Sequence, residues 1–95
     1  MSVQAVFTQM GIIIGEFIHE SEMDYEINNP CLLVTQRDSA GIIPLLALME
    51  ETNVTVKKDA VFSGKNFTPI VDVINKYNEM YGSGIVQIHT GTFKL

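Results

Sequence analysis

The sequence has few of the features that mark secreted, membrane-spanning and disulfide-bonded proteins. It contains one cysteine, Cys31, which cannot form an internal disulfide and which fits a reducing compartment. Its longest apolar run, Gly41–Met49, is interrupted by Pro44 and is far shorter than the roughly 20 residues needed to span a bilayer. The first ten residues have no basic side chain, whereas a signal peptide begins with one. We therefore expect a soluble cytoplasmic protein without a membrane partner.

Basic residues are also scarce, and the charge is unevenly distributed. The 95 residues have a formal net charge of −5. Residues 1–30 contain five acidic side chains and no Lys or Arg, whereas residues 31–95 contain equal numbers of both signs. This composition lacks the overall basic surface of many nucleic-acid-binding proteins. A local basic site is still open, because Arg37 and Lys65 lie in polar segments far from the acidic one.

No catalytic or metal-binding motif is recognisable. His19 and His89 are isolated, and their spacing does not match a zinc site. Cys31 stands in an apolar run, where a cysteine is usually a small core residue. The acidic residues of the first third have an even spacing that fits one solvent-exposed face of a hairpin better than a catalytic pair. We expect neither an enzyme, nor a metal site, nor a cofactor.

Apolar residues, in contrast, are abundant and make up 46% of the chain. This share is large for a single small domain, and self-association would cover the surplus. Their pattern predicts short strands followed by one helix, and hence a small, strongly bent β-sheet or barrel with one helix. Residues 2–10 fit a short helix or an irregular lead-in. The expected strands cover residues 11–18, 25–36, 42–49, 54–62 and 85–88.

Three of these strands have features of their own. Gly15 indicates a bulge or a close backbone approach in the first strand. The Asn28–Pro30 segment indicates a kink in the second, because Pro30 cannot donate a ladder hydrogen bond. The strand over 42–49 is apolar on both faces and is therefore expected to be buried on both sides.

A change of period marks the helix. Thr68 is a candidate cap, and Pro69 suits the first helical position. Gly82 and Gly84 are expected to end the helix before the last strand. The apolar residues that recur at helical spacing are Ile70, Val73, Ile74, Tyr77, Met80 and Tyr81.

Two polar turns, Gln36–Gly41 and Ser63–Asn66, close hydrophobic strands. Both supply hydrogen-bond donors on small or flexible side chains. Such a pair can hold a single-stranded nucleic acid, with Lys or Arg on phosphate and Asn or Ser on a base edge. Two ordinary surface turns are the alternative. The candidate binding residues are Arg37, Ser39, Ser63, Gly64, Lys65 and Asn66.

The spacing around these turns resembles the Sm/LSm family, which includes bacterial Hfq. The family's second motif is an aliphatic strand ending in Ile-Arg-Gly, any residue, Asn and an aliphatic position. The segment Val61–Phe67 follows this pattern, with Gly64 and Asn66 in place and Ser63 where the family has Arg. The family's first motif is similar to Leu32–Val34, Asp38 and the apolar residues 42–46. The chain is also similar to small Sm-like proteins from marine metagenomes and cyanophages.

The resemblance covers residues 12–70 and implies a single Sm-like domain over residues 1–95, with the helix and last strand over 68–90. It implies a strongly bent five-stranded barrel that joins about five to seven copies of itself in a ring and binds single-stranded RNA near the pore. The expected function is thus a ring-forming, non-catalytic protein that binds single-stranded RNA, or DNA, through the two turns. Asp38 is expected to order its turn. An oligomeric scaffold without nucleic-acid binding is the alternative, favoured by Ser63 and the acidic balance.

Overall fold

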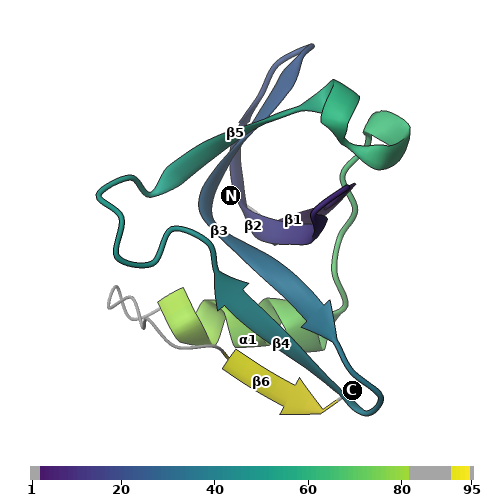
Figure 1. Ribbon diagram of the computed structural model, residues 1–95, viewed down its shortest axis with the longest axis vertical. Helices are drawn as coiled ribbons and strands as arrows, with labels where there is room; N and C mark the ends of the chain where they lie inside the picture. Colours follow the sequence, from purple (N-terminus) through teal and green to yellow (C-terminus); the bar gives the residue numbers. More distant parts are fainter. Residues whose placement is uncertain (1–2, 82–90, 95) are drawn as a thin grey trace.

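The chain folds as a bent β-sheet with one C-terminal helix, so the expected mainly β fold class is confirmed (Figure 1). A computed structural model describes residues 3–81 and, for the backbone alone, residues 91–94. The helix α1 covers Val71–Tyr81, and two short 3-10 turns, η1 and η2, cover Lys58–Ala60 and Phe62–Gly64. The strands are β1 (Val3–Thr8), β2 (Gly11–Glu20), β3 (Asp24–Thr35), β4 (Ser39–Pro44), β5 (Asn53–Lys57) and β6 (Gly91–Lys94).

All strands pair antiparallel in one sheet of six strands, one more than expected. The order is β1-β2-β3-β4-β6, and β5 also pairs with β3. The long strand β3 makes this possible, because residues 24–28 pair with β5 and residues 31–35 pair with β4 along the same edge. The predicted strand over 85–88 and the glycines Gly82 and Gly84 lie outside the described residues.

A bulge between β2 and β3, in the middle of the sheet, reverses the faces on which the side chains of β3 lie. Gly15 of β2 lies opposite two residues of β3, Asn29 and Pro30, and Asn29 has a φ of 49°. A Cβ at Gly15 would lie 2.5 Å from Cγ2 of Ile27, which confirms the predicted close backbone approach. Side chains of odd-numbered residues in β3 face one side of the sheet before the bulge and the other side after it, because the bulge adds one residue to the strand. The predicted kink at residues 28–30 is thus confirmed.

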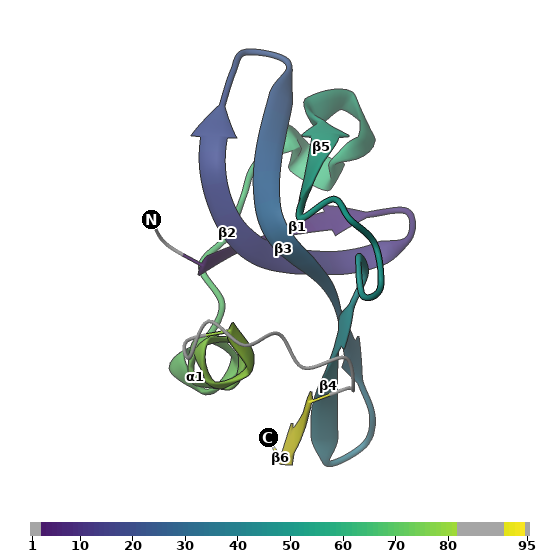
Figure 2. The same ribbon diagram turned by 90° about the vertical axis from the view of Figure 1, so that its left-hand side faces the viewer.

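The sheet consequently has an apolar core on each face. The inner core lies inside the bend and contains Val6, Ile13, Tyr25, Ile27 and Val61. The outer core lies under α1 and contains Val3, Ala5, Ile14, Cys31, Ile42, Val73, Tyr77 and Met80. Figure 2 shows the helix against one side of the bent strands, below the barrel-like end. A strand buried on both faces needs apolar residues at nearly every position, which explains much of the apolar content.

The bend almost closes the sheet into a barrel. It brings β1 to the segment after η1, where isolated bridges pair Thr8 with Val61 and Ala5 with Phe67. The backbone N–H of Ala5 donates to the carbonyl of Phe67 at 2.8 Å, and Phe67 donates back to Ala5 at 2.8 Å. Within the described residues these bridges do not extend into a ladder, so the barrel is open along this seam.

Two predicted strands were too long, and one segment without a definite prediction is a strand. Residues 3–8, for which a short helix and an irregular lead-in were both open, form β1, and their apolar residues fill both cores. The strand predicted over 42–49 ends at Pro44, after which the chain turns outward and leaves Leu48 84% exposed. The strand predicted over 54–62 ends at Lys57, and two 3-10 turns replace its second half. In both cases the apolar run continues beyond the last residue that has a neighbouring strand to pair with.

The predicted helix is confirmed, with a later start. The carbonyl of Ile70 accepts hydrogen bonds from the N–H groups of Val73 and Ile74, so the helix begins after Ile70. Thr68 does not cap it, because its hydroxyl donates to Oε1 of Gln4 at 3.3 Å. Residues Val73, Tyr77 and Met80 are buried against the sheet, as their helical spacing predicts.

Candidate functional site

The first polar turn, Gln36–Asp38, connects β3 to β4 and is exposed at its tip. It is closed by a hydrogen bond of 2.8 Å from the N–H of Gln36 to the carbonyl of Ser39, which is the first residue of β4. Arg37 is exposed and has no ion-pair partner among the described residues. Its charge is therefore available to an anionic ligand.

The second polar turn contains two residues with positive φ, Ser63 at 63° and Gly64 at 64°. This geometry is strained for Ser63 and ordinary for Gly64. Lys65 follows and is exposed, and it likewise has no ion-pair partner in the part of the chain that the structure describes. The turn thus presents a second available cation.

Asn66 is half-buried, and its side chain is hydrogen-bonded to the barrel. Its Nδ2 donates to Oε1 of Gln4 on β1 at 3.0 Å, and its Oδ1 accepts from the hydroxyl of Tyr25 at 3.5 Å. The same hydroxyl donates to the carbonyl of Gly64 at 3.2 Å. Gly64 and Asn66 therefore hold the turn against β1 and β3, and their expected part in RNA binding is not supported by their contacts.

The structure does not bring the two turns together. In both views, the β3–β4 turn lies at one end of the molecule and η2 lies near the other (Figures 1 and 2). A groove of about 310 Å³ lies on the same sheet face as α1, beyond the part of that face that the helix covers. It is lined by Ala5, Phe7, Ile12, Leu33, Thr35, Ala40, Phe67, Thr68, Pro69, Ile70 and Val73. We call this surface the Phe7–Phe67 groove.

The Phe7–Phe67 groove reaches towards both cations. Thr35, at one end of its lining, is two residues from Arg37, and Phe67, at the other, is two residues from Lys65. Its walls are almost entirely apolar, with two threonines as the polar side chains among them. The sequence pattern identified the cations, which are local signals, but missed the groove, which β1 and the segment after η2 build together.

Two exposed phenylalanines form one wall of the groove. The rings of Phe7 and Phe67 have centroids 5.3 Å apart and are tilted by 54°. Their exposed fractions are 42% and 45%, which is high for phenylalanines on a sheet face that is otherwise largely covered. The Ala5–Phe67 bridge fixes the backbone beside them. An aromatic pair of this kind is a candidate contact for a planar apolar ligand group.

A second and larger cavity, of about 670 Å³, opens at the end of the barrel beside β5. Val54 and Val56 of β5 line it from one side and Ile13 of β2 from the other. Met10 and Phe62 also line it and are 70% and 60% exposed. We call this surface the barrel cavity. It contains few polar groups and one carboxylate, Asp59, so it fits an apolar occupant.

The buried titratable groups near α1 are structural. Sγ of Cys31 lies 3.3 Å from the hydroxyl of Tyr81, and burial raises the pKa of the thiol to about 11. The hydroxyl of Tyr77 donates to the carbonyls of Asn28 and Asn29 at 3.1 and 2.9 Å, which satisfies the bulge of β3. Burial also raises the pKa of Tyr77 and Tyr81. A buried thiol with a raised pKa is a poor nucleophile.

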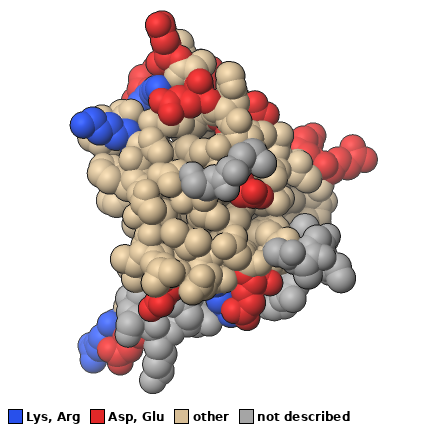
Figure 3. Space-filling model, turned by 180° about the vertical axis from the view of Figure 1, so that it is seen from behind, with Lys and Arg blue, Asp and Glu red and all other residues tan. Residues whose placement is uncertain are grey.

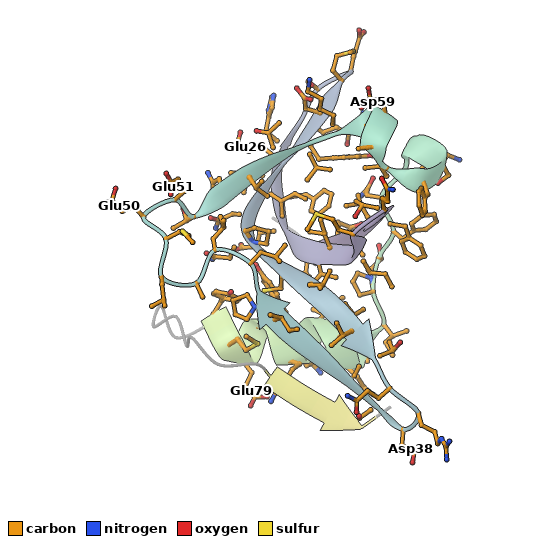
Figure 4. The ribbon with its side chains drawn as sticks, in the orientation of Figure 1. Glu26, Asp38, Glu50, Glu51, Asp59 and Glu79 are labelled. Atoms are coloured by element: carbon orange, nitrogen blue, oxygen red, sulfur yellow. The ribbon has the colours of Figure 1, made fainter. Side chains whose placement is uncertain are left out.

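The carboxylates are spread over the surface and do not converge. Figure 4 shows Glu26, Asp38, Glu50, Asp59 and Glu79 pointing outward from different elements. No group of three or more His, Cys, Asp or Glu residues that could hold a metal ion occurs among residues 3–81. Figure 3 shows acidic side chains gathered at the end of the molecule that the β2–β3 hairpin occupies, with a broad uncharged area below. None of the residues that line the Phe7–Phe67 groove is acidic.

No protein-family model matches the chain, and no curated protein matches it significantly. Over the described residues, no helix is both long and apolar enough to cross a membrane. The candidate site consequently depends on geometry: two cations without ion-pair partners in the described structure, one apolar groove between them, and a separate barrel cavity.

Proposed function

We propose that the chain is a ring-forming, non-catalytic Sm-like protein that binds single-stranded RNA or DNA. The observation that carries the proposal is the Phe7–Phe67 groove, whose lining includes Thr35, two residues from Arg37, and Phe67, two residues from Lys65. Proteins that bind single strands without a deep pocket combine cations along the backbone with an apolar surface for the bases. Arg37 and Lys65 would contact phosphates, with the hydroxyls of Ser39 and Ser63 beside them.

The acidic net charge does not oppose this arrangement. The only close Lys–Glu pair at the β2–β3 hairpin tip, among the described residues, is Lys58 with Glu20 at 2.6 Å, so part of the acidity there is compensated locally. Screening at physiological salt limits the remaining repulsion to about 8 Å. A strand that follows the groove is therefore governed by the two nearby cations.

Self-association is supported by two further surfaces. Among the described strands, β5 pairs only with β3, so its other edge has no ladder partner. The barrel cavity lies beside it, with the exposed side chains of Met10 and Phe62. An unpaired edge next to an apolar surface is normally covered, and copies of the same chain would cover it in a closed ring. About five to seven copies would repeat the two cations around the ring and raise avidity.

The test of nucleic-acid binding is the double variant Arg37→Ala/Lys65→Ala. Fluorescence anisotropy with labelled oligo(rU) and oligo(dT) between 50 and 200 mM salt should show weaker binding. Loss of two phosphate contacts should reduce the slope of log K against log salt by about 1.4, at about 0.7 per contact for single strands. The matched control is Lys57→Ala/Lys76→Ala, which removes the same charge from β5 and α1, outside the two polar turns. Equal affinity and slope in both double variants would contradict the assigned contacts.

An oligomeric scaffold without nucleic-acid binding is the second candidate. The barrel cavity and the structural use of Asn66 favour it. The solution mass of the nuclease-treated protein, together with the 260/280 nm absorbance ratio before treatment, separates the two. A discrete ring with co-purifying nucleic acid supports the first candidate, and a ring without nucleic acid supports the scaffold. A monomer would contradict both.

A further inference from the structure

The Phe7–Phe67 groove continues the sheet face that α1 covers. Phe7, Ile12 and Leu33 form one row across β1, β2 and β3, since Phe7 pairs with Ile12 and Ile12 pairs with Leu33. The row next to it, through Ala5, is buried under the helix. The first row is left partly open because the chain between η2 and α1 crosses its edge without covering it.

Exposure of this row is costly unless a ligand covers it. Leaving a phenylalanine half exposed on an otherwise covered face forgoes part of its burial free energy, which is about 25 cal/mol per Å² of apolar surface. Phe7 and Phe67 are 42% and 45% exposed, so their tilted contact leaves part of each ring open to solvent. A ring face open to solvent can stack on a nucleobase, and every base has a face to offer.

The combination of an aromatic pair with nearby cations favours a single-stranded nucleic acid over an uncharged apolar ligand. Arg37 lies two residues after Thr35 and Lys65 two residues before Phe67, so a strand of several nucleotides along the groove would meet one cation near each end. The carboxylates nearest in sequence to the lining are Asp38 and Asp72, and neither is part of it. A neutral base inside the groove is unaffected by them, whereas a phosphate there would be repelled. The arrangement thus places bases inside and phosphates at the ends.

We infer that Phe7 and Phe67 form a base-stacking platform for single-stranded nucleic acid, in the groove between the two cationic turns. This inference rests on the proposed nucleic-acid binding and adds the residues that contact the bases. It assigns base contact to aromatic side chains on the sheet face and to neither polar turn. The groove volume of about 310 Å³ is in the range of small-ligand sites, which suits single bases.

The test compares Phe7→Leu and Phe67→Leu with the control Met23→Leu, which changes an exposed apolar side chain outside both this groove and the barrel cavity. The probes are labelled oligo(rU), oligo(dT) and an abasic strand of the same length. Each groove variant should bind the two base-bearing strands about 5- to 100-fold more weakly, as removal of one stacking aromatic does. The salt slope and the affinity for the abasic strand should stay as in the wild type, because the phosphate contacts are unchanged.

A crosslinking measurement on the wild-type protein makes the result independent of any folding defect in the variants. Irradiation of an oligonucleotide that carries 5-iodouracil should attach the base to Phe7 or Phe67, as identified by mass spectrometry. Attachment only to residues outside the groove would overturn the stacking platform. Wild-type affinity of both groove variants would also overturn it, while the proposed function would stand if Arg37→Ala/Lys65→Ala still weakened binding. If the wild type bound none of the base-bearing strands, both proposals would fail.

Discussion

Replacement of Asn66 by Ala should destabilise the fold and leave the affinity of the folded protein for single strands unchanged. The sequence places Asn66 in a polar turn, where its amide is available to a base edge. The structure instead places its Nδ2 3.0 Å from Oε1 of Gln4 and its Oδ1 3.5 Å from the hydroxyl of Tyr25. Asn66 therefore joins the turn to β1 and β3 at the seam where the barrel is open.

The expected loss of stability is about 1 kcal/mol. A neutral hydrogen bond contributes about 0.5–1.5 kcal/mol net, and the bond to Gln4 has ordinary length. The contact of 3.5 Å to Tyr25 is at the limit for a hydrogen bond and adds little. Neither partner is stranded by the change, because Gln4 also accepts from Thr68 and Tyr25 also donates to Gly64. No additional penalty for an unsatisfied buried group is therefore due.

Urea unfolding followed by circular dichroism measures this loss of free energy. The protein concentration must be the same for both proteins, because self-association changes apparent stability. In a separate thermal scan, the melting temperature should fall by about 4–8 °C, the shift expected for 1 kcal/mol in a domain of this size. Asn75→Ala is the control, since Asn75 lies on the exposed face of α1, where alanine should not destabilise. An Asn66→Ala protein of wild-type stability that binds oligo(rU) more weakly would refute the structural role and return Asn66 to the binding site.

Two further predictions concern the interior. Gly15→Ala should lower the free energy of unfolding by about 1–3 kcal/mol, because the new Cβ would lie 2.5 Å from Cγ2 of Ile27. Adding Ile27→Leu to the same chain should recover part of this loss. An unchanged urea midpoint in Gly15→Ala would contradict the close approach. Since burial raises the pKa of Cys31 from 9.0 to about 11, the unfolded thiol ionises first, so stability should be complete below pH 9 and fall by about 3 kcal/mol towards pH 11. Urea midpoints at pH 8 and 10.5 should show this fall, and it should be smaller in Cys31→Ala, where the raised pKa values of Tyr77, Tyr81 and Lys58 still act in the same direction.

The parts of the fold that the sequence predicts are those with strong local signals. The helix is one, since Val73, Tyr77 and Met80 recur at helical spacing and are all buried. Gly15 is another, because a lone glycine in an apolar strand has few explanations besides a bulge or a close contact. These features depend on neighbouring residues along the chain, so no knowledge of the tertiary structure is needed to predict them.

The segments that the sequence does not predict depend on where a strand loses its partner. The apolar run after Pro44 continues to Met49, and composition alone predicts a buried strand there. The ladder between β3 and β4 stops at Pro44, however, and the chain turns outward with Leu48 at a φ of 68°. Exposed apolar residues at such a position are more typical of a surface that associates with another chain than of a free surface.

The candidate site divides in the same way. Arg37 and Lys65 are identifiable from sequence because charge and turn composition are local. Phe7 and Phe67 are 60 residues apart and share a wall only because the Ala5–Phe67 bridge brings β1 beside the segment after η2. No periodicity reports such a contact, since each phenylalanine taken alone is an ordinary core candidate.

The Sm-like positions and the proposed binding surface are therefore separable. Gly64 and Asn66, the residues on which the resemblance to the second family motif depends, accept hydrogen bonds from Tyr25 of β3, and Asn66 also joins the turn to Gln4 of β1. If these two residues stabilise the fold, their presence indicates a small bent barrel and does not indicate what the barrel binds. The same fold can bind different ligands. Binding must then be decided by side chains that the architecture does not require. The cations Arg37 and Lys65, with the aromatic pair between them, are residues of that kind.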